Sequence, residues 1–250
     1  MLLLALFLVA VTTVADFTGA AIVVWGFYRP TIVRLIVNFA VGTLLAVSVV
    51  DLLPEALALR GDAKPVLLAM LIGIVAAFLF ERFIAWYHCH DDHCETHPAS
   101  PGRKAALLAG SAVEEFIDGA AVGLALLVGT QNPQLAFLTT LAIFAHELPE
   151  TASKVATLAT FGVPPKKAML LVLATALAGF IGAASAVLFA GASAAILPFL
   201  LALVAGIFIY IATADLIPEL HRTFQRSSFV WEVFAMLAGL ALILVLGLLE

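Results

Sequence analysis

Long apolar stretches occur along the whole chain, and they restrict it to a fold that spans a membrane. Each is longer than the roughly 20 residues with which a helix crosses the hydrocarbon core of a bilayer. The eight stretches lie at about 1–27, 32–59, 65–87, 105–129, 135–161, 168–190, 194–219 and 229–249. Only 12% of the residues are charged, whereas a soluble domain carries about 25% because its surface faces water. We therefore predict an all-α polytopic membrane protein with eight transmembrane helices in a single transmembrane domain, residues 1–250.

Basic residues fall at alternate connections between these stretches, and this asymmetry predicts the orientation. The first, third, fifth and seventh connections carry Arg29, Arg34, Arg103, Lys104, Lys166, Lys167, Arg222 and Arg226. Of the other connections only the second is basic, through Arg60 and Lys64. Because cytoplasmic connections carry the excess of lysine and arginine, we expect a plasma-membrane protein with both termini outside the cell. The first stretch stays apolar to Phe27 and lacks a basic start, which favours a retained helix over a signal peptide.

One short motif occurs twice, near the ends of two predicted helices. The copies are Val50–Ala56 in the stretch 32–59 and Ala214–Leu220 in the stretch 194–219. In the predicted orientation these two helices run in opposite directions, as in the inverted repeats of many transporters. We therefore expect a 3+2+3 arrangement, in which helices 1–3 and helices 6–8 are repeats around a middle pair, helices 4 and 5. Coincidental recurrence of a helix-end turn is the alternative.

The two copies also place paired acidic residues at opposite ends of the predicted helices. Asp51 and Glu55 would form an outer mouth, and Asp215 and Glu219 an inner mouth, because negative charge concentrates cations near an opening. The net charge of −5 excludes a broad nucleic-acid-binding surface. The expected partners are therefore a divalent metal ion and the lipid bilayer, and the sequence leaves a homodimer open.

The middle pair of predicted helices is rich in ionisable residues, which cost about 2.5–3.5 kcal/mol each inside a span and therefore mark function. They are Glu114, Glu115 and Asp118 in the stretch 105–129, and His146, Glu147 and Glu150 in the stretch 135–161. Residues four apart share a helix face, so Glu114 lies in one column with Asp118. His146 lies in a second column with Glu150. Carboxylate and imidazole groups converging from two such columns suit a borderline divalent ion such as Zn²⁺, Mn²⁺ or Fe²⁺.

A buried salt-bridge network is the alternative explanation for these side chains. It is weaker than a metal site, because Lys154 is the only clearly cationic residue against five carboxylates in the two stretches. Pro149 lacks an N–H, which frees the carbonyl of Ala145 for a ligand or a water molecule. Lys154 follows Glu150 by one turn, where it is a candidate counter-ion that replaces a second metal. Its ammonium group reaching the cytoplasmic interface is an equally weighted alternative.

A polar segment between the third and fourth stretches, residues 88–104, concentrates further metal-binding side chains. Its candidate ligands are His88, Cys89, His90, His93, Cys94 and His97. The segment has no C-x-x-C pair, so a closed structural zinc site is not indicated. A flexible cytoplasmic loop that collects or senses metal is favoured over a merely hydrated linker, and a cytoplasmic location keeps both cysteines reduced.

Taken together, these motifs resemble those of the Zrt/Irt-like (ZIP) family of divalent-metal transporters. The resemblance covers nearly the whole chain and rests on Asn38–Gly42, Asp51–Ala56, Leu79–Arg82, Glu114–Gly119 and His146–Glu150. It implies a ZIP-type transmembrane domain in which helices 1, 4, 5 and 6 move as one body against helices 2, 3, 7 and 8.

The resemblance also implies two adjoining metal sites. The first would use Glu114, Asp118, His146 and Glu150. The second would use Glu115, Glu147 and a bridging Glu150. The chain departs from the family pattern where Glu114 replaces a common histidine, which makes the first site harder, and where Ile117 replaces a proline. The stretch 168–190 contains no acid to complete the second site.

The leading hypothesis is transport of divalent metal into the cytoplasm, with zinc as the first candidate and iron, manganese or cadmium as others. The metal would be the substrate, with no resident cofactor and no enzymatic reaction. One alternative is an intramembrane metalloenzyme, because His146–Glu150 is close to the H-E-x-x-H zinc motif. Another is a membrane-anchored metal sensor that uses the 88–97 segment.

Overall fold

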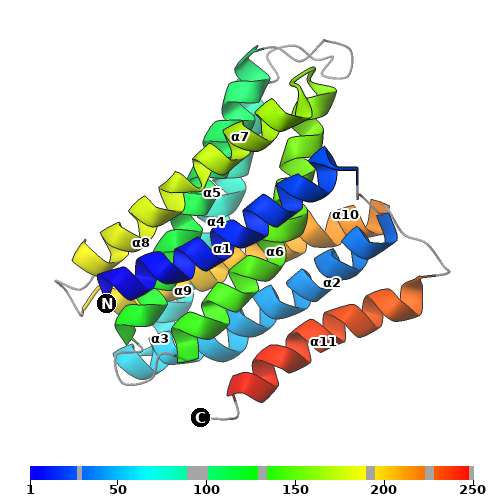
Figure 1. Cartoon of the computed structure of the whole chain (residues 1–250). Helices are drawn as coiled ribbons and strands as arrows, with labels where there is room; N and C mark the ends of the chain where they lie inside the picture. Colours follow the sequence, from blue (N-terminus) through cyan, green and yellow to red (C-terminus); the bar gives the residue numbers. More distant parts are fainter. Residues whose placement is uncertain (27–29, 89–100, 129–133, 190–194, 223–227, 248–250) are drawn as a thin grey trace.

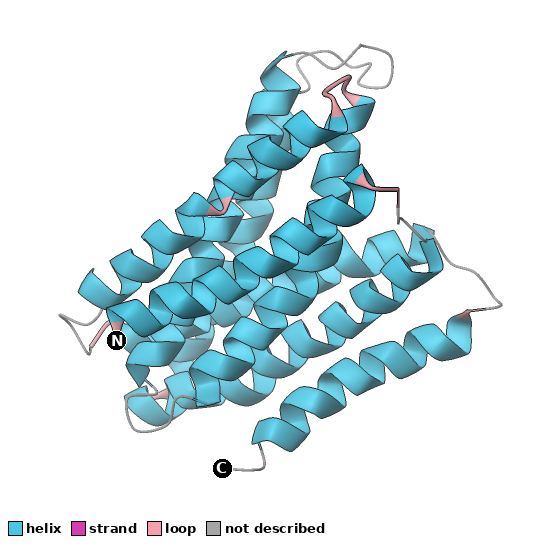
Figure 2. Cartoon of the chain, in the orientation of Figure 1, coloured by secondary structure: helices cyan, strands magenta, loops and turns pink. Residues whose placement is uncertain are grey.

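The computed structural model describes the whole chain except residues 27–29, 89–100, 129–133, 190–194, 223–227 and 248–250. The described residues form helices joined by short turns, with no strand among them (Figure 2). The predicted all-α architecture is therefore confirmed. Long helices lie side by side in a bundle, and the start of α1 and the end of α11 lie toward the same end of it (Figure 1).

The helical elements correspond closely to the apolar stretches of the sequence. In chain order they are α1 (Leu2–Val24), α2 (Pro30–Ala46), η1 (Val47–Leu52), α3 (Leu53–Arg60), α4 (Ala63–His88), α5 (Pro101–Val128), α6 (Gln134–Thr160), α7 (Pro165–Thr175), α8 (Leu177–Phe189), α9 (Leu197–Tyr210), η3 (Ile211–Leu216), α10 (Ile217–Arg222) and α11 (Phe229–Gly247). Helix α5 begins at Pro101, a residue type suited to a first helical turn. The last residues of the polar segment 88–104 therefore belong to α5.

Six helical segments are long and apolar enough to cross a membrane, judged on the described residues. They are Leu2–Val24, Thr31–Arg60, Ala63–Phe83, Pro165–Phe189, Leu197–Ala214 and Phe229–Gly247. Helices α5 and α6 are not among them, and these are the helices that carry the cluster of acidic residues described below. The chain is thus a polytopic membrane protein whose two most polar long helices lie within an apolar bundle.

The two copies of the repeated motif have the same local structure. Each begins in a π-helical segment, η1 or η3, and continues into a short α-helix that has a proline in its first turn. Pro54 and Pro218 have no N–H, so the usual bond to the carbonyl four residues back is lost. A π-turn accommodates this change: the N–H of Leu53 donates to the carbonyl of Ser48, five residues back, and the N–H of Ile217 donates to that of Ala212 in the same way.

The helices pack in four closely associated pairs: α5 with α8, α2 with α11, α1 with α6, and α4 with α9. Glycines at these contacts let the backbones approach each other, as is common between membrane helices. A Cβ atom on Gly19 of α1 would overlap the carbonyl of Leu148 on α6, and one on Gly182 of α8 would overlap the carbonyl of Phe116 on α5. These glycines place α1 against one face of α6 and α8 against one face of α5. They therefore determine which other faces of α5 and α6 remain for polar contacts.

A buried ion pair joins α2 to α11. Arg34 Nε lies 3.1 Å from Glu232 Oε1, and only 7% of each side chain is exposed. Ser228 completes the cluster by donating to Glu232 Oε1 at 2.6 Å. Because buried charges require partners, this cluster ties the start of α11 to the start of α2, next to which α11 runs in Figure 1.

Candidate metal centre

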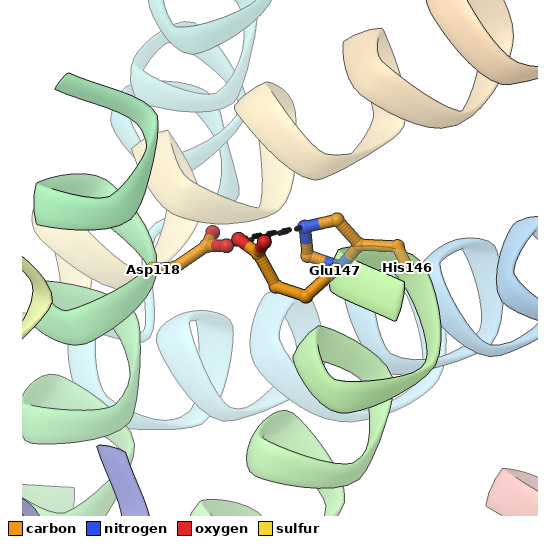
Figure 3. Close-up of side chains that lie close together, drawn as sticks. All are labelled: Asp118, His146 and Glu147. Carbon is orange, nitrogen blue, oxygen red and sulfur yellow. Dashed lines mark ion pairs between the residues drawn. The ribbon is translucent and has the colours of Figure 1, made fainter. Parts of the chain in front are cut away.

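His146 on α6 occupies the middle of a buried polar cluster, and its ring is held in a defined orientation. Its Nδ1 lies 3.2 Å from the carbonyl oxygen of Ala142, one turn earlier on the same helix. If Nδ1 carries the proton and donates to this carbonyl, Nε2 is left as the free ligand atom; metal-binding histidines commonly use this arrangement. Nε2 faces Asp118 of α5 at 3.1 Å from Oδ2, and Glu147 points toward the same space (Figure 3).

Asp118, His146 and Glu147 form a group whose spacing fits a metal ion. Each offers a ligand atom, and these atoms lie within 4.8 Å of one another. Exposed fractions are 3%, 0% and 1%. Two ligands of a tetrahedral ion with bonds near 2.1 Å stand about 3.4 Å apart. The distances from His146 Nε2, 3.1 Å to Asp118 Oδ2 and 4.0 Å to Glu147 Oε1, bracket that value.

A second group adjoins the first and shares Glu147 with it. Its other members are Glu115 of α5 and Asp16 of α1, and the three ligand atoms again lie within 4.8 Å of one another. The hydroxyl of Thr151 donates to Asp16 Oδ1 at 2.9 Å and also lies 3.4 Å from Glu147 Oε2. Oδ2 of Asp16 and Oε1 of Glu115 are buried without a hydrogen-bond partner among the described residues. The second group contains only oxygen ligands, which suits a harder cation than the first group.

Glu114 and Glu150 lie in a different polar contact. The ammonium nitrogen of Lys154 is 2.6 Å from Glu150 Oε1 and 3.1 Å from Glu114 Oε2. The second oxygen of Glu150 is 4.0 Å from His146 Nε2, so Glu150 contacts both Lys154 and the edge of the first group. In this structure the candidate ligands Glu114 and Glu150 are therefore paired with an ammonium group.

The structure thus brings all six central candidates onto facing surfaces of α5 and α6, but groups them differently from the sequence interpretation. Glu147, rather than Glu150, is the carboxylate common to the two groups. Asp16 was not among the predicted ligands, although a lone aspartate in an otherwise apolar stretch is itself an indication of function. The sequence left open whether Asp16 lines the ion path or bonds a threonine, because the pattern of α1 does not reveal which neighbouring helix it faces.

A cavity of about 410 Å³ reaches the centre from the side of α4 and α9. Glu114 and Asp118 line it, together with mostly apolar residues of α4, α5 and α9. Glu81 on α4 also lines the cavity and accepts a hydrogen bond from the Tyr210 hydroxyl. The cavity therefore gives Asp118 a connection toward the end of α4 that precedes the 89–100 segment.

The remaining predicted sites are described only in part. Asp51 lies in η1, where its Oδ1 faces Gly247 at the end of α11, and Glu55 is half-buried in α3. The side chains of Asp215 and Glu219 lie outside the described residues, as does that of His88. The other loop candidates, Cys89, His90, His93, Cys94 and His97, fall in the 89–100 segment and also lie outside the described part.

Comparison with known proteins agrees with the motifs on α5 and α6. A family model described as ZIP zinc transporter matches residues 88–247, which include both helices of the centre. The chain belongs to the ZIP family. The resemblance inferred from the sequence motifs is therefore confirmed.

Several ZIP relatives carry zinc transporter names. The chain is 33% identical over 145 residues to zinc transporter foi of Drosophila melanogaster, covering 58% of this chain and 20% of the relative. It is 37% identical over 151 residues to zinc transporter zipt-7.2 of Caenorhabditis elegans, covering 57% and 31%. Zinc transporter ZIP4 of Homo sapiens is 27% identical over 289 residues, covering 88% of this chain and 44% of that protein. The chain therefore spans less than half the length of these relatives.

Proposed function

We propose that this ZIP-family chain transports divalent metal cations across the membrane into the cytoplasm. Zinc is the proposed main substrate, and iron, manganese and cadmium are further candidates. The relatives named as zinc transporters support a transport function rather than an enzymatic one. The metal is then the substrate of the centre between α5 and α6.

The buried group of Asp118, His146 and Glu147 is the observation that carries this proposal. It combines a histidine held through Nδ1 with two carboxylates at metal-ligand spacing, deep in an apolar helix bundle. Uncompensated carboxylates are costly in such surroundings, and a divalent cation would offset that cost. Imidazole together with carboxylate suits Zn²⁺, Mn²⁺ and Fe²⁺. The cavity beside Asp118 supports access for an ion.

We further propose that α5 and α6 also cross the membrane, which gives eight spans in a 3+2+3 inverted repeat. In such a repeat α1, α2, α4 and α5 correspond to α8, α9, α11 and α6, in that order. The pair α1–α6 then corresponds to the pair α8–α5, and the pair α2–α11 to the pair α9–α4. These are the four closely associated pairs of the bundle. The matching π-helical segments η1 and η3 support the same symmetry.

The proposed orientation places both termini outside the cell and the 88–104 segment in the cytoplasm of a plasma-membrane protein. The start of α1 and the end of α11 lie toward one end of the bundle (Figure 1), which supports an even number of spans. The same single domain, residues 1–250, would then contain the acidic mouths, the centre and the metal-collecting loop, with a homodimer as its proposed assembly.

Uptake by liposomes that contain the purified protein tests the proposal. We expect accumulation of Zn²⁺ in a panel that also contains Fe²⁺, Mn²⁺ and Cd²⁺. Asp118→Asn should lower the initial rate by at least about tenfold, because even changes to the groups that orient metal ligands commonly cost 10–100-fold. Asp62→Asn, at an exposed aspartate between α3 and α4, is the matched control and should change the rate less than twofold. Folded wild-type protein that accumulates none of the four metals would refute transport.

A further inference from the structure

Lys154 joins the two helices of the centre through a pair of carboxylates. Its ammonium nitrogen contacts Glu150 one turn earlier on α6 and Glu114 across on α5, at 2.6 Å and 3.1 Å. All three side chains are largely withdrawn from solvent, with 11%, 17% and 23% exposed for Lys154, Glu150 and Glu114. The alternative role, in which the ammonium group reaches out to the membrane interface, does not match this arrangement.

Glu150 connects this cluster to the ligand group around His146. One carboxylate oxygen contacts Lys154, while the other lies 4.0 Å from His146 Nε2. Glu114 precedes Asp118 by one turn on the same face of α5, so it also lies next to the ligand group. A small rotation of either carboxylate would exchange contact with the ammonium group for contact with a cation beside His146. The same acids are therefore available to two competing cations, one of them covalently attached.

We propose, on the basis that the chain transports divalent metal, that Lys154 is a tethered cation. It offsets part of the negative charge of Glu114 and Glu150 when the centre is empty, and an entering metal ion displaces it. Carboxylates left without a cation in a low-dielectric interior are strongly destabilising, and the flexible four-carbon stem of lysine allows its charge to leave and return. Return of the ammonium group helps the metal to dissociate.

This competition predicts that removing the ammonium group of Lys154 tightens metal binding and slows metal release. Without the ammonium group, metal gains undivided access to Glu114 and Glu150, and it also leaves more slowly because nothing replaces it. In Lys154→Gln we therefore expect both the KM and the kcat for Zn²⁺ uptake to fall about fivefold or more, since tighter ground-state binding lowers KM without aiding turnover. Lys154→Arg keeps the charge and should restore both parameters to within about twofold of the wild type.

Uptake kinetics in liposomes separate this role from a purely structural one. If Lys154 only stabilises the fold, Lys154→Gln lowers kcat and leaves KM unchanged or raised, and that result would overturn the proposal. If the wild-type protein shows no uptake at all, the proposed transport function itself is wrong. If the wild type transports Zn²⁺ with the same KM as Lys154→Gln, the tethered-cation proposal is wrong while the proposed transport function still holds.

A second measurement uses the wild-type chain, so it applies even when Lys154→Gln does not fold. Reductive methylation with formaldehyde and sodium cyanoborohydride as the hydride donor, read by mass spectrometry of peptides, reports how often each lysine amine leaves its partners. We expect saturating Zn²⁺ to raise the methylation rate of Lys154 at least threefold. Lys64, exposed in the first turn of α4, is the internal control and should not change. An unchanged or reduced rate at Lys154, with Zn²⁺ bound, would contradict displacement.

Discussion

Glu147 is the residue on which the two ligand groups depend. It follows His146 directly, so its side chain leaves α6 about 100° away and reaches toward Asp16 as well as Asp118. Thr151, one turn later, lies close enough to hydrogen-bond both Asp16 and Glu147. A single carboxylate thus links α1, α5 and α6 at the depth where an ion would bind.

At this scale we predict a graded loss of function. Glu147→Gln should lower Zn²⁺ uptake about 100-fold, because both ligand groups lose a charged oxygen ligand. Asp16→Asn should lower it about tenfold, since it affects only the second group; both values follow the usual range for changes in a metal's ligand shell. Initial rates, normalised to monodisperse protein on size exclusion, provide the comparison. A Glu147→Gln rate above that of Asp16→Asn would show that Glu147 is not shared.

The ion pair between Arg34 and Glu232 is the clearest polar contact between helices outside the centre. The pair lies at the contact of α2 with α11, where Gly42 and Gly239 also let the two backbones approach each other. The cluster with Ser228 satisfies both charges locally. The pair should therefore affect the stability of the α2–α11 contact without entering the metal path.

We predict that Arg34→Met destabilises the folded protein by about 3–5 kcal/mol, because it leaves Glu232 buried without its cationic partner. The double variant Arg34→Met/Glu232→Leu should recover most of that loss, since an apolar pair of similar size avoids the desolvation cost. Thermal unfolding in detergent, followed by tryptophan fluorescence, measures both variants. Equal destabilisation of the single and double variants would show that the charges are not what joins the helices.

The four helix pairs can be grouped into the two bodies that the family resemblance implies. Helices α1, α5, α6 and α8 contribute the pairs α1–α6 and α5–α8, and the other body contains the pairs α2–α11 and α4–α9. The ligand groups belong entirely to the first body. The family resemblance further implies that the first body carries the metal past the other, and this movement stays a prediction.

A pair of cross-links tests this movement. Helix α7 belongs to the first body because it forms one membrane-length segment with α8. Ser111 of α5 and Thr175 of α7 are hydrogen-bonded at 2.9 Å within that body, whereas Gln134 of α6 bonds to the carbonyl of Leu246 on α11, in the other body. In a Cys89→Ser/Cys94→Ser background, cysteines joined by a short bismaleimide at Gln134 and Leu246 should abolish uptake. The same reagent joining cysteines at Ser111 and Thr175 should leave at least half of it. Full uptake after cross-linking Gln134 to Leu246 would rule out the movement.

The sequence alone determined the class of the protein and the chemistry of its centre. Apolar stretches of bilayer length require helices, because backbone groups in hydrocarbon must bond within their own segment. The helical period likewise placed Glu114 with Asp118, and His146 with Glu150, each on one face of its own helix. These properties are local, so periodicity and residue type are sufficient to predict them.

Only the tertiary structure decided which of these faces meet and which residues share a cation. The relative rotation of α5 and α6 is set by side-chain packing and by glycine contacts such as Gly182 of α8 against Phe116 of α5 and Gly19 of α1 against Leu148 of α6, and no helical period encodes that rotation. This rotation places Glu147 in both ligand groups and places Glu150 in contact with the ammonium group of Lys154. Asp16 joined the second group and accepts a hydrogen bond from Thr151, 135 residues away, because the packing of α1 on α6 depends on contacts between segments remote in the sequence.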